Sequence, residues 1–526
     1  MQIKLALLLL SLLFALHFIR TIYRQIASPQ RSIPGPFFAR FGRFWYFWRV
    51  QRGTFHHDNI ALHAKYGPIV RVAENMYSID VPDKNVYGIG SKFPKSDWYE
   101  GWKHPSPDRF TVFPDRDMKR HAETRKKFQN LYSMSSLVSY EKYVDNCIDI
   151  FLQRMGSFSR SGELIDLAHW FQCYAFDVMG EITYSERFGF LDHGKDIGGI
   201  LVALDNSMIY STLAGIYSWA HPYLYAIMEK IPGSGAVGRN FLMKFVQQKI
   251  AERNQSRENT KGSVEKLQDQ NAPRDFLTKL SDAHERDPEK VTGYHIFMMG
   301  LSNIIAGSDT TAVSLSSVLY HLARNPASLT RLRRELKELQ QSREVDQSTA
   351  GNKEVGFISF KEAQALPYLQ AVIKEALRLH PATGLPLWRV VPEGGALIAG
   401  NHLPAGAIVG INSWVAHYNP AIFGPDAHTF RPERWLESQT TKNGEEQLRN
   451  MEANYLPFGL GSRTCLGRHV SILEMCKLVP EMVTRFDLEI EVGGEEWKTM
   501  NYWFVKPVDF HVRVRARVND DTKEHM

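Results

Sequence analysis

The sequence predicts a mainly α-helical protein with small β-sheets, an α+β fold. Apolar residues recur at helical spacing in several long segments, whereas runs that alternate apolar and polar residues are few and short. The chain has 526 residues, 44% of them hydrophobic and 23% charged, which is enough to bury a substantial core. The predicted helices are Tyr140–Arg154, Phe171–Thr183, Asn240–Arg253, Leu315–Arg324, Leu329–Leu339 and Tyr368–Leu379, and the clearest strands are Ile69–Val72 and Phe510–Val514.

The first element is an apolar segment, Leu5–Ile19, which reaches residue 26 if Arg20 and Arg24 extend toward lipid headgroups. A cleaved signal peptide is the alternative, but the small-residue cleavage pattern is missing. We therefore expect residues 1–26 to form a single transmembrane anchor. Lys4 is the only charged residue before the apolar run, so the positive-inside rule places the rest of the chain in the cytosol. That topology is typical of a single-pass protein of the endoplasmic reticulum.

Residues 27–36 predict a basic, proline-rich hinge, because Pro34 and Pro36 fix φ and favour extended geometry before them. Residues 37–518 then form one catalytic domain, followed by a polar tail at 519–526. Two polar stretches, Asn254–Arg274 and Gln340–Gly356, predict surface connections within that domain.

The four cysteines, Cys147, Cys173, Cys465 and Cys476, are too few and too scattered for a disulfide framework or a CxxC zinc site. They indicate a reducing compartment. The net charge of +6 is modest, and the basic residues include no recognised nucleic-acid-binding module, so we expect no nucleic-acid partner.

The longest predicted helix begins with Thr292 as its N-cap and ends near Arg324, before Asn325-Pro326. Its middle, Ala306–Thr311, places a glycine, an acid and three hydroxyl residues in an apolar run, which lowers helix propensity. Hydroxyls that bond the i−4 carbonyl would open a kink or bulge there. The alternative is an ordinary helix with an exposed polar patch.

Two further motifs follow. Glu375 and Arg378 lie at i and i+3 on one helix face, a spacing that usually means a solvated ion pair, and Arg434 follows within Phe430–Trp435. The loop Phe458–Gly467 then presents Cys465 among glycines just before a helix, whose amide groups would stabilise a thiolate. A buried structural cysteine in a tight turn is the alternative.

In this order the motifs resemble those of the cytochrome P450 monooxygenases, over nearly the whole chain. The resemblance implies the cytochrome P450 fold, with a single haem domain behind the anchor. It implies that the thiolate of Cys465 is the axial ligand of haem b iron and that the enzyme activates dioxygen. The cofactor-binding residues of the loop would be Phe458, Gly459, Arg463, Cys465 and Gly467.

The same resemblance assigns roles to the other motifs. Asp309 and Thr310 would be the acid and alcohol that deliver protons during oxygen activation, with Asp309 relaying them from solvent. Ala306 and Gly307 would leave space over the haem. Glu375, Arg378 and Arg434 would form a buried structural network on the thiolate side. The haem propionates need cationic partners, for which the candidates are His121, Arg125, Arg389 and Arg463.

No flavin or nicotinamide fingerprint is present, so electrons must come from another protein. The resemblance implies an NADPH-dependent flavoprotein reductase, with a cytochrome b5-type donor as a second candidate. The docking face would be basic and would include Lys119, Arg120, Lys126, Lys127 and Arg468.

The segments that would line the substrate pocket are aromatic and aliphatic and imply a hydrophobic small molecule: Trp98–Phe113, Met208–Tyr217, Ile305–Ala306, Thr383–Leu387 and Tyr502–Val505. Likeness to filamentous-fungal members suggests secondary metabolism or detoxification. Two other functions stay open. A haem-thiolate isomerase or dehydratase would need no reductase, and the intact Asp309-Thr310 pair argues against it. A haem sensor without enzymatic activity should carry a signalling module, and none is evident in the sequence.

Overall fold

The structure is a computed structural model that describes residues 27–261, 274–350, 356–437, 444–491 and 497–517, together with Leu5, Leu12, Leu16, Ile19, Arg20, Ile22 and Tyr23. Most of the predicted anchor and the tail at 519–526 therefore lie outside the described residues. Within the described part, no single helix meets the length and apolarity that a membrane crossing needs. The helices Ile200–Ile216 and Ser218–Met228 meet them only as a pair, which is bent by 115°.

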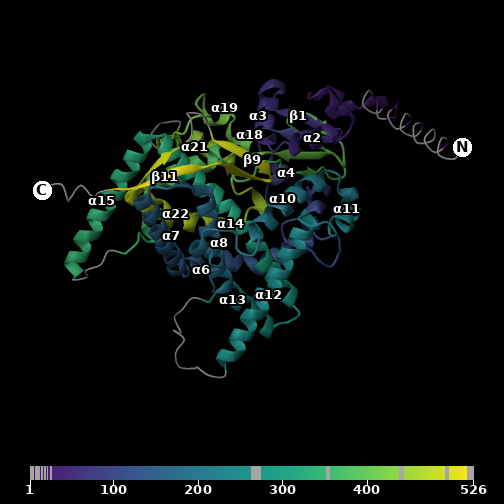
Figure 1. The fold of residues 1–526 in the computed structure, drawn as a ribbon. Coiled ribbons are helices and arrows are strands. Elements are labelled where there is room, and N and C mark those ends of the chain that lie inside the picture. Colours follow the sequence, from purple (N-terminus) through teal and green to yellow (C-terminus); the bar gives the residue numbers. More distant parts are fainter. Residues whose placement is uncertain are drawn as a thin grey trace.

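Helices dominate the described chain, and Figure 1 shows the strands β1, β9 and β11 gathered above the helices α12 and α13. The helices of eight or more residues are α2 (Phe44–Gln51), α3 (Phe55–Tyr66), α5 (Met118–Phe128), α7 (Glu141–Ser161), α8 (Leu167–Tyr184), α10 (Ile200–Ile216), α11 (His221–Met228), α12 (Gly235–Lys261), α13 (Phe276–Arg286), α14 (Gly293–Arg324), α15 (Pro326–Ala350), α17 (Pro367–Leu379), α21 (Gly444–Ala453) and α22 (Arg468–Arg485). Shorter helices include α18 (Ser413–His417), α20 (Arg434–Glu437), the 3₁₀ helix η3 (Asp97–Trp102) and the 3₁₀ helix η6 (Gly461–Arg463).

The strands form small sheets. The largest has the order β1-β2-β7-β4, in which β2 and β7 run parallel and the other neighbours antiparallel. Its strands are β1 (Ile69–Ala73), β2 (Met76–Ile79), β7 (Ile408–Ile411) and β4 (Arg389–Val390). The remaining sheets pair β3 (Leu164–Asp166) with β11 (His511–Ala516) and β8 (Phe486–Ile490), β9 (Lys498–Tyr502) with β10 (Phe504–Val508), and β5 (Ala396–Ile398) with β6 (Asn401–Leu403). The predicted α+β class is confirmed.

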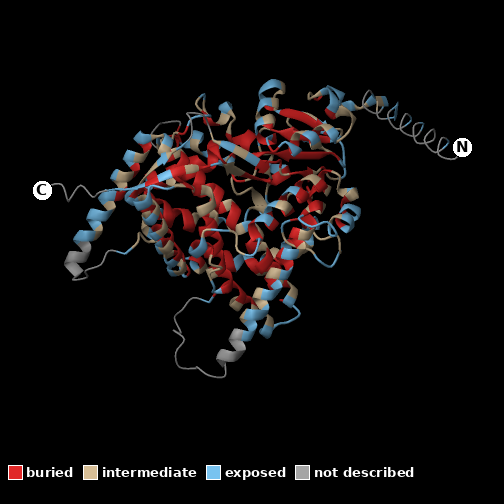
Figure 2. Cartoon of the chain, in the orientation of Figure 1, coloured by how far each residue is buried: buried red, intermediate tan, exposed pale blue. Residues whose placement is uncertain are grey.

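The helix α14 runs through the middle of the fold, where Figure 2 shows buried residues concentrated. Thr292 is its N-cap as predicted, and the side chain of His295 accepts from the Thr292 backbone amide in a capping box. Its hydroxyls bond the preceding turn, but the helix stays α-helical from Gly293 to Arg324 without the predicted bulge. Each back-bond leaves the backbone ladder in place, so the local cost in propensity does not interrupt the helix.

Gly307 lies where α14 packs against α8. A Cβ at Gly307 would lie 2.8 Å from Cγ and Sδ of Met179 in α8. The missing side chain therefore lets α14 and α8 approach each other closely. Ala306, one residue earlier, is exposed.

The predicted helices are confirmed, and each extends beyond its predicted bounds at one end or at both. Residues Gln340–Ala350, predicted as a connection, continue α15, and Asn254–Lys261 continue α12. Residues 262–273 and 351–355 lie outside the described part. Glutamine, glutamate and arginine are good helix formers even in a polar stretch, and Gln340 bonds Glu344 one turn later at 3.1 Å.

The proline-rich segment at 29–36 lies against β1. The Arg71 amide donates to the Pro34 carbonyl at 2.8 Å, and the Arg71 guanidinium donates to the Gln30 carbonyl at 2.6 Å. A Cβ on Gly35 would collide with the Arg71 carbonyl, and Ile33 is buried. This segment is therefore held by the fold at its C-terminal end.

Candidate active site

The cysteine loop is closed by its own backbone. The Cys465 amide donates to the Phe458 carbonyl at 2.8 Å, and the Thr464 hydroxyl donates to the same oxygen at 3.2 Å. Gly459 and Gly461 have φ of +70° and +59°, which a side chain would strain, and a Cβ on Gly461 would also collide with the Tyr87 carbonyl. The glycines thus fold the loop tightly before α22.

Cys465 is the exposed cysteine of the four, whereas Cys147, Cys173 and Cys476 are buried. Although the residue is solvent-accessible, the protein atoms around its sulfur desolvate the Cys465 thiol and raise its pKa above the usual value, while the amides of Gly467 and Arg468 and the Arg125 guanidinium oppose this rise. The contribution of the amides that the sequence predicted is present, although desolvation outweighs it in the metal-free chain. Direct coordination to a metal ion would deprotonate the thiol.

The four predicted propionate partners come together near this loop. His121 and Arg125 lie one turn apart in α5, Arg389 in β4 and Arg463 in the loop itself. Burial and the positive charges of Arg463, Lys95, Arg125 and Arg389 lower the pKa of His121 to about 3. Burial and Arg389 likewise lower the pKa of Arg463 to about 10.

Lys95 is a fifth basic residue of this cluster, and sequence reasoning missed it. Its side chain is buried, its ammonium donates to the Phe113 carbonyl, and it lies 4.2 Å from the ring centroid of Tyr99. Burial, Arg389 and Arg463 lower its pKa well below the usual value. Like charges placed together are costly unless an anion binds among them, so the cluster fits two carboxylates beside an accessible thiol.

On α14 the two predicted catalytic residues have different surroundings. The Thr310 hydroxyl donates to the Ala306 carbonyl at 2.8 Å. Asp309 is buried, and its carboxylate accepts from the Gln172 amide at 2.5 Å and pairs with the Lys506 ammonium at 2.8 Å. One residue further, the Thr311 hydroxyl bonds the Ser471 hydroxyl of α22 at 3.2 Å, which ties α14 to the helix that follows Cys465.

Asp309 reaches solvent only through other groups. Lys506 of β10 also pairs with Asp205 of α10 at 2.5 Å. The exposed fraction of the side chain rises from 0% for Asp309 to 27% for Lys506 and 52% for Asp205. Lys506 and Asp205 thus connect the Asp309 carboxylate to the surface, and Lys506 is a second residue that the sequence did not reveal.

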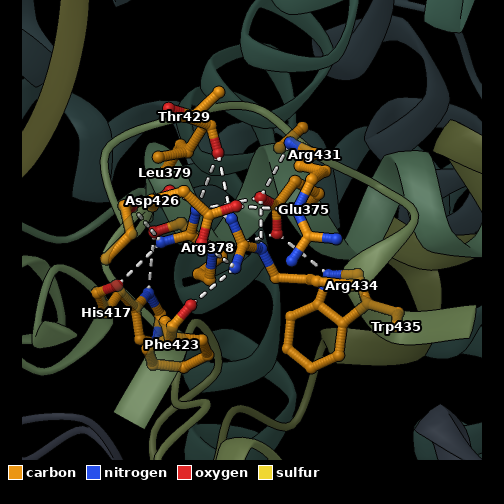
Figure 3. Close-up of polar contacts among 12 residues, drawn as sticks. Glu375, Arg378, Leu379, His417, Phe423, Asp426, Thr429, Arg431, Arg434 and Trp435 are labelled. Atoms are coloured by element: carbon orange, nitrogen blue, oxygen red, sulfur yellow. Dashed lines mark hydrogen bonds and ion pairs between the residues drawn. The ribbon is translucent and has the colours of Figure 1, made fainter. Parts of the chain in front are cut away.

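Figure 3 shows the third motif, a buried network around Glu375. Arg378 donates two hydrogen bonds of 2.9 Å to the Glu375 carboxylate, and Arg434 donates a third at 2.8 Å. The Trp435 indole N–H and the Arg431 backbone amide also donate to the Glu375 carboxylate, at 2.9 and 3.1 Å. Burial alone would raise the pKa of Glu375, but the two arginines hold it below the usual range. The solvated ion pair is thereby excluded, since the side chains are between 0% and 2% exposed.

His417 connects this network to the cysteine loop. Its Nδ1 bonds the Arg378 carbonyl at 2.9 Å, and its Nε2 accepts from the Leu456 amide at 2.8 Å, two residues before Phe458. The ring also stacks on Tyr455, with centroids 5.5 Å apart. Burial and the charge of Arg378 lower the pKa of His417 to about 3, so the ring is neutral and Nε2 is free to accept.

The sequence model described as Cytochrome P450 matches residues 34–511. This chain belongs to the cytochrome P450 family. Pisatin demethylase of Fusarium vanettenii is 39% identical over 94% of this chain and 92% of its own length. The cytochrome P450 monooxygenase cicH of Emericella nidulans is 35% identical over 97% and 98%, and a cytochrome P450 monooxygenase of Aspergillus terreus is 35% identical over 90% and 93%.

Membership of the cytochrome P450 family makes the protein an oxygen-incorporating oxidoreductase. Its cofactors are haem, held by a cysteine thiolate, and dioxygen, with electrons from a reductase. The residues described above fit haem: one accessible thiol on a rigid loop stands beside a cluster of cations suited to two propionates.

Proposed function

We propose that this cytochrome P450 oxidises a hydrophobic small molecule, with Cys465 as the thiolate ligand and Asp309 and Thr310 as the proton-delivering pair. The observation that carries the proposal is the accessible Cys465 thiol beside basic residues from four separate segments, of which Lys95 and Arg389 are buried. Bound haem supplies the activation of dioxygen and the transfer of one oxygen atom to the substrate.

The chain's own residues then have separate tasks. His121, Arg125, Arg389, Arg463 and Lys95 bind and orient the propionates. The Glu375 network and His417 hold the cysteine loop at a fixed position. The Thr310 hydroxyl holds a proton above the site, and the buried Asp309 carboxylate, fixed by Gln172 and Lys506, takes part in resupplying it.

The proposed electron donor is an NADPH-dependent flavoprotein reductase, with a cytochrome b5-type protein as a second donor. An exposed basic surface near the cysteine loop supports this, because Lys119, Lys126 and Arg468 are exposed there. Arg120 is tied to Asp115, and Lys127 contacts His295, so these two contribute less to docking than the sequence suggested.

We also propose attachment to the endoplasmic reticulum membrane through residues 1–26, with the catalytic domain in the cytosol. An apolar surface supports this: Phe37, Phe38 and Phe44 are 66%, 71% and 73% exposed, and Trp219 is 74% exposed. The segment with the three phenylalanines and the segment with Trp219 are neighbours, because Arg43 donates to the Ile216 carbonyl at 2.8 Å. Deletion of residues 1–26 should release protein from microsomes with haem binding intact, and unchanged pelleting would contradict the anchor.

Relatives named pisatin demethylase and cytochrome P450 monooxygenase support a role in fungal-type secondary metabolism or detoxification. The test is reconstitution with a reductase and NADPH, with candidate hydrophobic substrates supplied under labelled dioxygen. Product that carries one labelled oxygen atom supports the monooxygenase. Product formed without NADPH or reductase would instead support a haem-thiolate isomerase or dehydratase.

A further inference from the structure

The helix α22 follows the cysteine loop and carries a buried carboxyl group that has no partner in the described part of the chain. Glu474 is 0% exposed, and neither of its carboxyl oxygens has a hydrogen-bond partner among the described residues. An isolated carboxylate is costly to remove from water, so a buried one either pairs with a cation or takes up a proton. The groups around Glu474 decide between these two states.

Two titratable side chains lie near Glu474, and both are neutral. Tyr174 of α8 and Cys147 of α7 are fully buried. Burial, and then the charge of Glu474, raises the pKa of Tyr174 well above its usual value, and burial together with nearby carboxylates does the same for the pKa of Cys147. The Tyr174 hydroxyl also has no hydrogen-bond partner within the described ranges. Neither neighbour therefore supplies a positive charge to Glu474.

The basic residue closest to Glu474 along α22 is Lys477, and it is already paired. Its ammonium lies 2.8 Å from the carboxylate of Glu141 and 2.8 Å from that of Asp145, both on α7. It also donates to the Ile358 carbonyl at 2.6 Å. These three contacts account for the three protons of the ammonium group, so Lys477 has none left for Glu474.

The elements around α22 hold their charged groups in other contacts. Those that pack against it are α7, α14, α15, β8, α6 (Met134–Val138) and α16 (Phe360–Gln364), of which α6 contains no charged residue. On the others and on α8, the buried and half-buried charged groups besides those paired with Lys477 have these partners: Asp309 with Lys506, Arg333 with Asp487, Glu335 with the Tyr368 and Leu369 amides, Glu362 with Arg343, Arg154 with the Leu191 carbonyl, Asp177 with the amides of residues 189–191, and Glu181 with the charge of Arg187. The described surroundings of Glu474 thus supply no counter-cation.

We propose that Glu474 is a proton-binding site, a neutral carboxylic acid at pH 7 whose ionisation at higher pH loosens α22 behind the cysteine loop. A proton removes the charge of the carboxylate without a counter-cation. Burial raises the pKa of Glu474 well above its usual value, which agrees with this assignment. Ser471, one turn earlier on α22, bonds Thr311 of α14, so this stretch of α22 joins the cysteine loop to α14.

A buried proton on Glu474 makes the folded protein less stable as the pH rises. The unfolded chain loses this proton near the ordinary pKa of 4.5, whereas the folded protein keeps it. The stabilisation by the proton is therefore complete below pH 4.5 and is lost as the pH rises through the folded-state pKa. Relative to Glu474→Gln, the wild-type unfolding constant should increase about tenfold for each pH unit between pH 5 and pH 7.

Infrared spectroscopy of the oxidised holoenzyme at pH 7 tests the protonation state directly. The C=O stretch of a neutral carboxylic acid lies at higher frequency than the carboxylate and amide bands, and it moves down in D2O because the acid hydrogen exchanges. Glu474→Gln should remove one such band from the wild-type spectrum. Glu474→Met, which has an apolar side chain of similar length, should remove the same band and serves if the glutamine variant does not fold.

Glu481→Gln is the matched control, because Glu481 is a buried carboxylate on the same helix that has partners. It pairs with Arg485 at 2.9 Å and accepts from the Ile358 amide at 3.4 Å. This variant should keep the acid band. A band that survives both substitutions of Glu474, or one that disappears in Glu481→Gln, would overturn the proposal.

Denaturant unfolding at pH 5, 6 and 7 gives an independent readout, since the buried histidines contribute equally to wild type and Glu474→Gln. A ratio of the two unfolding constants that stays the same over this range overturns the proton site. Above pH 7, the carbon monoxide spectrum of the reduced protein reports the haem site. The wild type should lose its red-shifted band at a lower pH than Glu474→Gln, and loss at the same pH would overturn the link to the cysteine loop.

Discussion

Asp309 and Thr310 are adjacent in the sequence, yet α14 directs them to different tasks. Thr310 bonds back to Ala306 and has a partly exposed side chain, whereas Asp309 is buried between Gln172 and Lys506. A hydroxyl exchanges a proton without gaining a lasting charge. A carboxylate paired with an ammonium group is stabilised in its charged form by that partner.

Thr310→Ala should let oxygen bind but release it as hydrogen peroxide, because the hydroxyl that holds the proton is gone. The measurement is the ratio of product to NADPH consumed at saturating substrate. Ser316→Ala is the matched control, since that hydroxyl bonds the Ala312 carbonyl at 2.7 Å in the same way, six residues further along α14. An unchanged ratio for Thr310→Ala would remove the proton-delivery role.

Asp309→Asn should slow oxygen-dependent turnover while coupling falls less than in Thr310→Ala. The amide still accepts a hydrogen bond but leaves the Lys506 ammonium paired only with Asp205. Stopped-flow decay of the oxygenated enzyme checks this directly. A decay rate equal to that of wild type would mean that the pair with Lys506 is purely structural.

At the scale of elements, the Glu375 network fastens α17 and α20 to the loop that carries Cys465. Arg378 also donates to the carbonyls of His417 and Ala427 at 2.8 and 2.7 Å, so a buried charge satisfies several backbone oxygens. His417, which also bonds the Arg378 carbonyl, accepts a hydrogen bond from the Leu456 amide and so links the network to the cysteine loop. The thiolate loop is thus positioned by a network whose central carboxylate, Glu375, lies 83 residues before Phe458 in the sequence.

Arg434→Ala should destabilise the protein by about 3–5 kcal/mol and promote haem loss, because it leaves the Glu375 charge buried with one partner fewer. Arg431→Ala is the matched control. Its ion pairs with Asp426 and Glu437 are 35% to 60% exposed and should contribute less than about 1 kcal/mol. Denaturant unfolding and haem transfer to an acceptor protein measure both effects, and equal losses in the two variants would contradict the buried network.

Across the whole molecule, buried neutral histidines make folding sensitive to acid. Burial lowers the pKa of His63 and of His380 to about 4, against an ordinary value of 6.5. A lowered folded-state pKa means that the stabilisation is complete above pH 6.5. It is lost as pH falls toward 4, because the unfolded chain takes up the proton first.

Each such histidine should lower stability by about 2 kcal/mol at pH 5 relative to pH 7. The unfolding midpoint should therefore drop steeply between pH 6.5 and pH 4. His63→Gln, which keeps a side chain able to bond Ser78, should make this slope shallower. A slope identical to that of wild type would show that His63 does not titrate on unfolding.

Local spacing made much of the fold and site predictable. The helical spacing of apolar residues, the cysteine loop and the Glu375–Arg378 spacing each involve residues that are close together in the sequence. They can therefore be recognised from the sequence alone. Lys95, His417 and Lys506 were missed because their partners are distant: His417 lies 39 residues from both Arg378 and Leu456, and Lys506 lies 301 residues from Asp205. The close approach of Gly307 to Met179 could not be predicted either, because Met179 lies on another helix.

The central claim is that Cys465 is the thiolate ligand of haem, and the carbon monoxide spectrum of the reduced protein tests it most directly. Wild type should give the strongly red-shifted Soret band that only thiolate ligation produces, and Cys465→Ala should lose that band together with oxygenase activity. Cys476→Ala, at a buried cysteine bonded by Gln370, should keep both. A red-shifted band that persists in Cys465→Ala would contradict the account and move the ligand to another residue.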